Sequence, residues 1–62
     1  MELKQIKENL LDLIAESQSL GNRLLAEMPV SGDSRREKSW REYQRVRALQ
    51  STLQEAFEKL TN

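Results

Sequence analysis

The spacing of the apolar residues, broken once by a proline, limits this chain to a pair of amphipathic helices. In the first half, apolar residues recur at steps of three and four between Leu3 and Leu24. This is the period of an α-helix with one buried face. Pro29 has no backbone N–H to donate and disfavours helical backbone at Met28. The first helix is therefore expected to end there, and a second helical pattern follows.

The sequence predicts one all-α domain over residues 1–62, an antiparallel two-helix hairpin. Its helices are expected at residues 2–27 and 34–60, joined by a loop at 28–33. Ser34 and Glu37 have the spacing of a capping box at the start of the second helix, with Asp33 as the alternative N-cap residue. Because the connection is short, the two helices should be antiparallel neighbours.

Each helix is expected to bury one apolar seam, as in a coiled coil. The predicted seam residues are Leu3, Ile6, Leu10, Leu13, Leu20, Leu24, Val46, Leu49, Leu53 and Leu60. Two small residues, Ser17 and Gly21, lie one turn apart near this seam. They either admit a side chain of a partner or make room for Trp40 or Tyr43 of the same hairpin. The second interpretation is favoured, since large side chains need small neighbours to pack densely.

Further apolar residues lie beside the seam or away from it and form a predicted partner-binding set. These residues are Leu11, Ile14, Leu25, Met28, Trp40, Tyr43 and Phe57. A chain of 62 residues builds only a marginal core, and this one has no cysteine for a disulfide. Association is the remaining source of stability. We therefore expect a homodimeric four-helix bundle, or a bundle completed by another helical protein, and the sequence leaves these two open.

Catalysis has few candidate residues. The chain has no histidine and no cysteine, and its two glycines are eleven residues apart, which excludes a glycine-rich phosphate loop. Glu8, Asp12 and Glu16 are one turn apart and are interpreted as a solvated helix face. We therefore expect no enzyme activity, no catalytic residue, no metal, no cofactor and no small-molecule substrate.

Basic residues cluster at the start of the second helix, although the ten basic and ten acidic residues of the chain cancel. The predicted electrostatic patch consists of Arg35, Lys38, Arg41 and Arg45, with Trp40 and Tyr43 between them. Basic residues with aromatics favour an alternative function, a small nucleic-acid-binding regulator using residues 35–47. Zero net charge argues against it and favours an electrostatic match to acidic residues of the first helix or of a neighbouring chain.

The same residues bear on where the protein is located. No run of about 18 apolar residues is present, so no membrane-spanning segment is expected. Acidic residues within the first thirteen positions, Glu2, Glu8 and Asp12, are not typical of a signal peptide. The expected location is the cytoplasm.

The second half of the chain resembles a family of small bacterial proteins. Residues 40–50, WREYQRVRALQ, follow a Gly32-Asp33 turn and resemble the second helix of small type III secretion needle-subunit chaperones. The resemblance implies a helical hairpin that, together with a co-chaperone, holds a needle subunit in the cytoplasm. With the expectations above, it favours a non-catalytic adaptor or chaperone-like protein.

Overall fold

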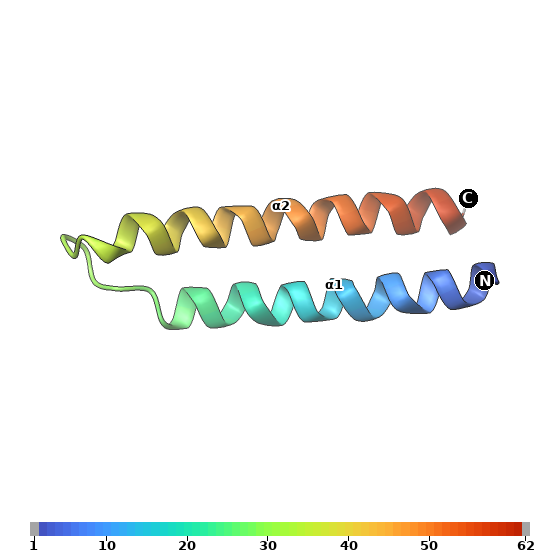
Figure 1. Ribbon diagram of the computed structural model, residues 1–62, viewed down its shortest axis with the longest axis horizontal. Helices are drawn as coiled ribbons and strands as arrows, with labels where there is room; N and C mark the ends of the chain where they lie inside the picture. The colour runs from blue at the N-terminus through green and yellow to red at the C-terminus, as the bar shows by residue number, and fades with distance from the viewer. Residues whose placement is uncertain (1, 62) are drawn as a thin grey trace.

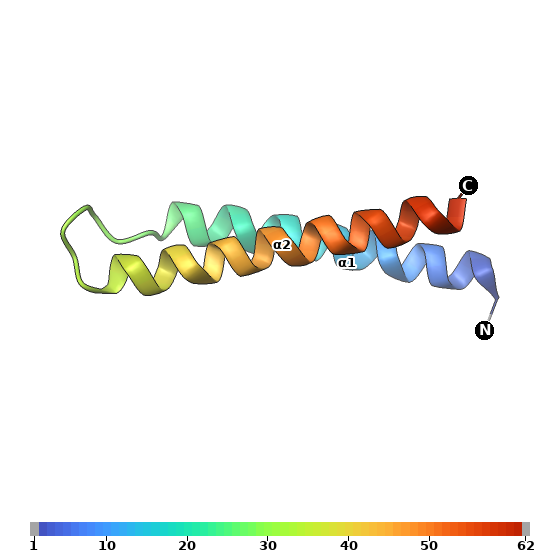
Figure 2. The same ribbon diagram turned by 90° about the horizontal axis from the view of Figure 1, so that it is seen from above.

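The chain folds into two long antiparallel helices. The computed structural model describes residues 2–61 and contains α1, Leu3–Ala26, and α2, Arg35–Thr61, with the two ends of the chain at one end of the molecule (Figure 1). Seen from above, α2 crosses over α1 at a shallow angle (Figure 2). No strand occurs between residues 2 and 61. The predicted all-α hairpin is therefore confirmed. The helices were predicted at residues 2–27 and 34–60 and are observed at residues 3–26 and 35–61.

A short irregular connection reverses the chain between the helices. At the end of α1 the Glu27 N–H donates to the Arg23 carbonyl at 2.9 Å. A tight turn follows, in which the Asp33 N–H donates to the Val30 carbonyl at 3.1 Å. Gly32, the third residue of this turn, has φ +94°, the left-handed value that a type II turn requires there. The turn brings Asp33 to the start of α2.

Asp33, and not the predicted capping box, caps α2. Its carboxylate accepts the Arg35 N–H at 2.8 Å and pairs with the Arg35 guanidinium, also at 2.8 Å. The Glu37 carboxylate pairs with Arg41 at 2.6 Å instead of turning back to Ser34, so the capping-box prediction is wrong. A carboxylate here satisfies a free backbone donor and the positive end of the helix dipole together.

The residues between the helices follow a regular pattern of threes and fours. In α2 the less exposed residues from position 39 onward are Ser39, Tyr43, Val46, Gln50, Leu53, Ala56, Phe57 and Leu60. In α1 the less exposed residues from position 10 onward are Leu10, Ile14, Ser17, Gly21 and Leu24, and Met28 continues this row beyond the end of the helix. These two rows form the seam of the hairpin.

The seam of α1 is partly rotated from its predicted position. Ile6, Leu10 and Leu24 are half-buried as expected. Leu3, Leu13 and Leu20 were expected in the seam and are exposed, as is Leu49 of α2, whereas Ile14 was expected beside the seam and lies within it. The apolar arc of α1 is broader than one neighbouring helix can cover. α2 packs against the middle of that arc, the row containing Ile14, and the rows on both flanks remain exposed.

The small residues of α1 make this close approach possible. A Cβ at Gly21 would lie 3.8 Å from Tyr43 Cε1 and 3.8 Å from Val46 Cγ1. Ser17 is only 6% exposed, and its hydroxyl donates to the Ile14 carbonyl at 2.8 Å. Gly21 therefore makes room for Tyr43 of the same hairpin, as the favoured interpretation held; Trp40 remains exposed.

A hairpin of this shape has no enclosed core. The molecule measures 48 × 15 × 15 Å and exposes 5009 Å² of surface. A compact chain of 7.2 kDa would expose about 4100 Å². Among residues 2–61, no apolar side chain is buried. The hairpin is one layer of helices, and domains are built from two or more.

Candidate interaction surfaces

A shallow apolar groove runs along one side of the seam. It has a volume of about 170 Å³, and both helices contribute to it. The residues that line it are Leu13, Glu16, Ser17, Leu20, Val46, Leu49 and Leu53. We call this surface the groove face. All of its lining residues are apolar or small except Glu16.

The positions of the leucines follow from helix geometry. Leu13 and Leu20 are seven residues apart, so they lie on one stripe along the flank of α1. Leu49 lies on the matching flank of α2, beside Val46 and Leu53 of the seam. Their exposed fractions are 48%, 42% and 53% for Leu13, Leu20 and Leu49. This surface is suited to the apolar side chains of another helix.

The opposite side of the seam carries a second apolar surface, which we call the Trp face. It consists of Leu11 and Leu25 on α1 and Trp40 on α2, all of them exposed. Trp40 stacks on Tyr43 with the ring centroids 5.5 Å apart. Gln18 lies midway between Leu11 and Leu25 on their stripe, and Arg47 follows Trp40 seven residues later. Polar side chains therefore divide the Trp face.

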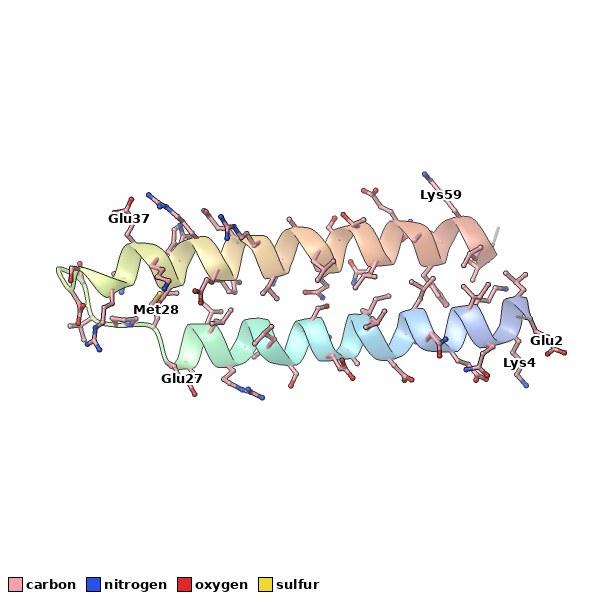
Figure 3. All side chains as sticks on the ribbon, in the orientation of Figure 1. Glu2, Lys4, Glu27, Met28, Glu37 and Lys59 are labelled. Carbon is pink, nitrogen blue, oxygen red and sulfur yellow. The ribbon has the colours of Figure 1, made fainter. Side chains whose placement is uncertain are left out.

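The structure separates the predicted partner-binding residues into two groups. Leu11, Leu25 and Trp40 are exposed on the Trp face. The other four are half-buried along the seam or at its loop end, where Met28 lies (Figure 3): Ile14, Met28, Tyr43 and Phe57. Their role in binding a partner stays a prediction. The groove leucines were missed as surface residues because they had been assigned to the seam.

The predicted electrostatic patch is exposed, and half of it is paired locally. Arg35 binds Asp33 and Arg41 binds Glu37, while Lys38 and Arg45 form no ion pair with residues 2–61. Hydrogen bonds from the side chain and backbone of Arg35 lower the pKa of Asp33. Across the described residues, no ion pair joins α1 to α2. The expected electrostatic match, to acids of the first helix or of a neighbouring chain, therefore does not take the form of an ion pair between the helices within residues 2–61 and stays a prediction.

One polar atom within the seam has no partner. The Oε1 atom of Gln50 is buried and accepts no hydrogen bond from the described residues. Gln50 occupies a seam position between Val46 and Leu53, where the sequence pattern had predicted no polar residue. An unpaired acceptor costs about 1–3 kcal/mol. The seam is therefore weaker at its centre than an apolar one would be.

Near the ends of the hairpin, the side chains of Lys4, Glu27, Glu37 and Lys59 point away from the other helix (Figure 3). Within residues 2–61, neither helix is both long enough and apolar enough to cross a membrane. The same span contains no group of three or more histidine, cysteine, aspartate or glutamate residues placed to hold a metal ion. No protein-family model, no curated protein and no solved structure matches this chain.

Proposed function

We propose that this protein is a small non-catalytic interaction module, an adaptor or chaperone-like hairpin that packs an apolar flank against other helices. One observation carries the proposal. No apolar side chain of residues 2–61 is buried, although leucines on both sides of the seam are half exposed. Monomeric soluble proteins seldom expose apolar residues in continuous stripes, and such stripes mark interfaces.

The energetics support the same conclusion. Full burial of a leucine contributes about 1.5–3 kcal/mol, so covering the exposed half of one contributes about 1 kcal/mol, and the total stability of a small domain is about 5–15 kcal/mol. Covering Leu13, Leu20 and Leu49 would therefore contribute a large fraction of the stability of this fold. The hairpin is expected to reach full stability only when another helical surface covers it.

The class of partner follows from the shape of the hairpin. An elongated helix pair with an apolar groove is suited to a partner that presents one or two helices. The likeness of residues 40–50 to type III secretion needle-subunit chaperones agrees with this class and supplies a specific candidate, a bacterial export substrate held in the cytoplasm. The partner can equally be a second copy of the chain.

The paired arginines argue against the alternative, a nucleic-acid-binding regulator. Arg35 and Arg41 are neutralised by Asp33 and Glu37, which leaves Lys38 and Arg45 as the unpaired members of the patch. Binding to phosphates depends on several free cations and weakens steeply as salt is raised. Tight retention on heparin at low salt that falls steeply as the salt concentration is raised would favour the regulator.

Amide hydrogen exchange tests the proposal. At sub-micromolar concentration the isolated chain should exchange its seam amides rapidly and melt over a broad range. Protection should rise when helical partners cover the apolar faces, because binding to the native state alone stabilises it. A dilute monomer with strongly protected seam amides and a sharp cooperative melt would contradict the proposal.

A further inference from the structure

The hairpin exposes more surface than a compact chain of its mass, and the excess is about the area that one protein buries in a dimer interface. Its 5009 Å² exceeds the surface of a compact chain of the same mass by roughly 900 Å². A stable protein interface of standard size buries about 800 Å² on each partner. One continuous face covered by one partner of similar size would therefore bring the chain to the surface expected of a folded protein.

Charged residues border the groove face on both helices. Each lies three or four residues from a groove leucine, or seven residues along a leucine stripe, with or without further steps of seven, and all are exposed. Arg35 has the same spacing but is paired with Asp33. The α1 rim consists of Glu16 and Arg23 on α1 and of the two residues that flank this helix, Glu2 and Glu27; the α2 rim consists of Lys38, Glu42, Arg45 and Lys59. None forms an ion pair within residues 2–61.

The two rims are complementary in sign and in order. The α1 rim has three acids and one base, and the α2 rim has three bases and one acid. Gly21 lies against Tyr43, so each step back along α1 corresponds to one step forward along α2. Within one helical turn of this register, the rims pair Glu27 with Lys38, Arg23 with Glu42, Glu16 with Arg45 and Glu2 with Lys59. Arg23 is the one base of the α1 rim and Glu42 is the one acid of the α2 rim, so this pair also has opposite charges.

Helical spacing places the two rims beyond the groove leucines, on the outer side of each helix, so these charges cannot be paired in this way inside one hairpin. They meet only when the α1 rim of one chain lies beside the α2 rim of another. A two-fold axis parallel to the helices brings the rims together in this manner twice. An axis perpendicular to the helices would instead place each rim against its own copy, acid facing acid.

We propose that a second copy of this chain docks on the groove face, with the two-fold axis along the bundle and both connecting loops at the same end. Leu13 and Leu49 of one copy then lie beside Leu49 and Leu13 of the other. Apolar packing supplies the affinity, and the rim charges select the orientation. This inference rests on the proposed function and specifies both the partner, a second copy of the chain, and the relative orientation of the two copies.

The position of the loops gives the first test. Ser31 lies in the exposed connection, and the chain has no cysteine, so Ser31→Cys allows a single spin label to be attached. In the proposed dimer the two labels lie at one end, within about 30 Å, because a bundle is only two helices across. A separation near the 48 Å length of the hairpin would overturn the orientation.

Reversal of the rim charges gives the second test. Glu16→Arg alone, or Arg45→Glu alone, should weaken the dimer about tenfold at low salt and much less at about 0.5 M salt. An equimolar mixture of the two variants should restore wild-type affinity, because both rim contacts of the mixed dimer are again opposite in sign. The control is Asp12→Arg, one turn before Glu16, because Asp12 is exposed and forms no ion pair with the described residues. If the mixture does not restore affinity, the proposed pairing is wrong.

The mass in solution separates this inference from the function on which it rests. A chain that stays monomeric at millimolar concentration, melts broadly and binds apolar dyes would contradict the docking of a second copy on the groove face. It would leave the proposed function in place. A monomer that is fully helical and melts cooperatively would overturn both. A dimer with close labels and restored mixed affinity supports the whole arrangement.

Discussion

The groove face and the Trp face expose leucines to a similar extent, yet they differ in continuity. On the groove face, leucines from both helices line one hollow, and the charged residues lie at its edges. On the Trp face, Gln18 and Arg47 interrupt the row formed by Leu11, Leu25 and Trp40. Interface cores are depleted of charge and surrounded by a polar rim, which matches the groove face alone. Exposed apolar area therefore indicates association, and continuity indicates where it occurs.

Matched substitutions on the two faces should have the largest effect and the clearest contrast. Leu20 and Leu25 are 42% and 46% exposed, so a change to glutamate perturbs the isolated hairpin similarly at each. Leu20→Glu should weaken self-association more than about 100-fold, since two leucines are lost from the interface and two charges are desolvated. Leu25→Glu should weaken it less than about tenfold. Equal losses of self-association affinity in the two variants, measured by sedimentation equilibrium, would contradict the assignment of the dimer interface to the groove face.

Replacement of the unpaired seam amide should strengthen the hairpin without changing its association. Gln50→Leu removes a buried acceptor that has no partner and adds apolar contact. The free energy of unfolding should rise by about 1–2 kcal/mol in urea titrations. The dimer dissociation constant of the folded chain should change little, because Gln50 lies in the seam. A loss of stability would show that the amide has a partner in solution.

The two glycines should respond in opposite directions. A Cβ at Gly21 meets Tyr43 and Val46 at ordinary contact distance, and the residue is helical, so Gly21→Ala should stabilise by about 0.5–1 kcal/mol. Gly32 has φ +94°, where an alanine is strained, so Gly32→Ala should destabilise. Thermal melts at fixed concentration measure both changes. Destabilisation by Gly21→Ala would mean that the helices approach more closely than described.

The smallest expected effect is a pH dependence at the start of α2. Arg35 lowers the pKa of Asp33 in the folded chain, so the contribution of this carboxylate is present at neutral pH. It is lost as the pH falls through that lowered pKa, below the usual aspartate range near 4. Asp33→Asn should flatten this part of the stability profile in acid titrations followed by circular dichroism. An unchanged acid profile in Asp33→Asn would show that the Asp33 carboxylate does not contribute to the pH dependence of stability.

The sequence predicted the hairpin because its signals are local. The three-and-four spacing and Pro29 set the two helices, and Asp33 was recognised as one of two possible caps. The rotation of α1 was not predictable in this way. Three adjacent apolar rows, marked by Leu13, Ile14 and Leu11, could each have faced α2. The approach of Tyr43 to Gly21 selects the middle row, and that contact depends on both helices together.

The most direct test of the groove-face dimer is a dilution series followed by the leucine methyl resonances. Helicity measured in parallel identifies the concentrations at which the hairpin remains folded. We predict that the methyl signals of Leu13, Leu20 and Leu49 shift together as the dimer forms, while those of Leu11 and Leu25 stay nearly constant. Shifts confined to Leu11 and Leu25, or spectra that do not depend on concentration, would contradict it.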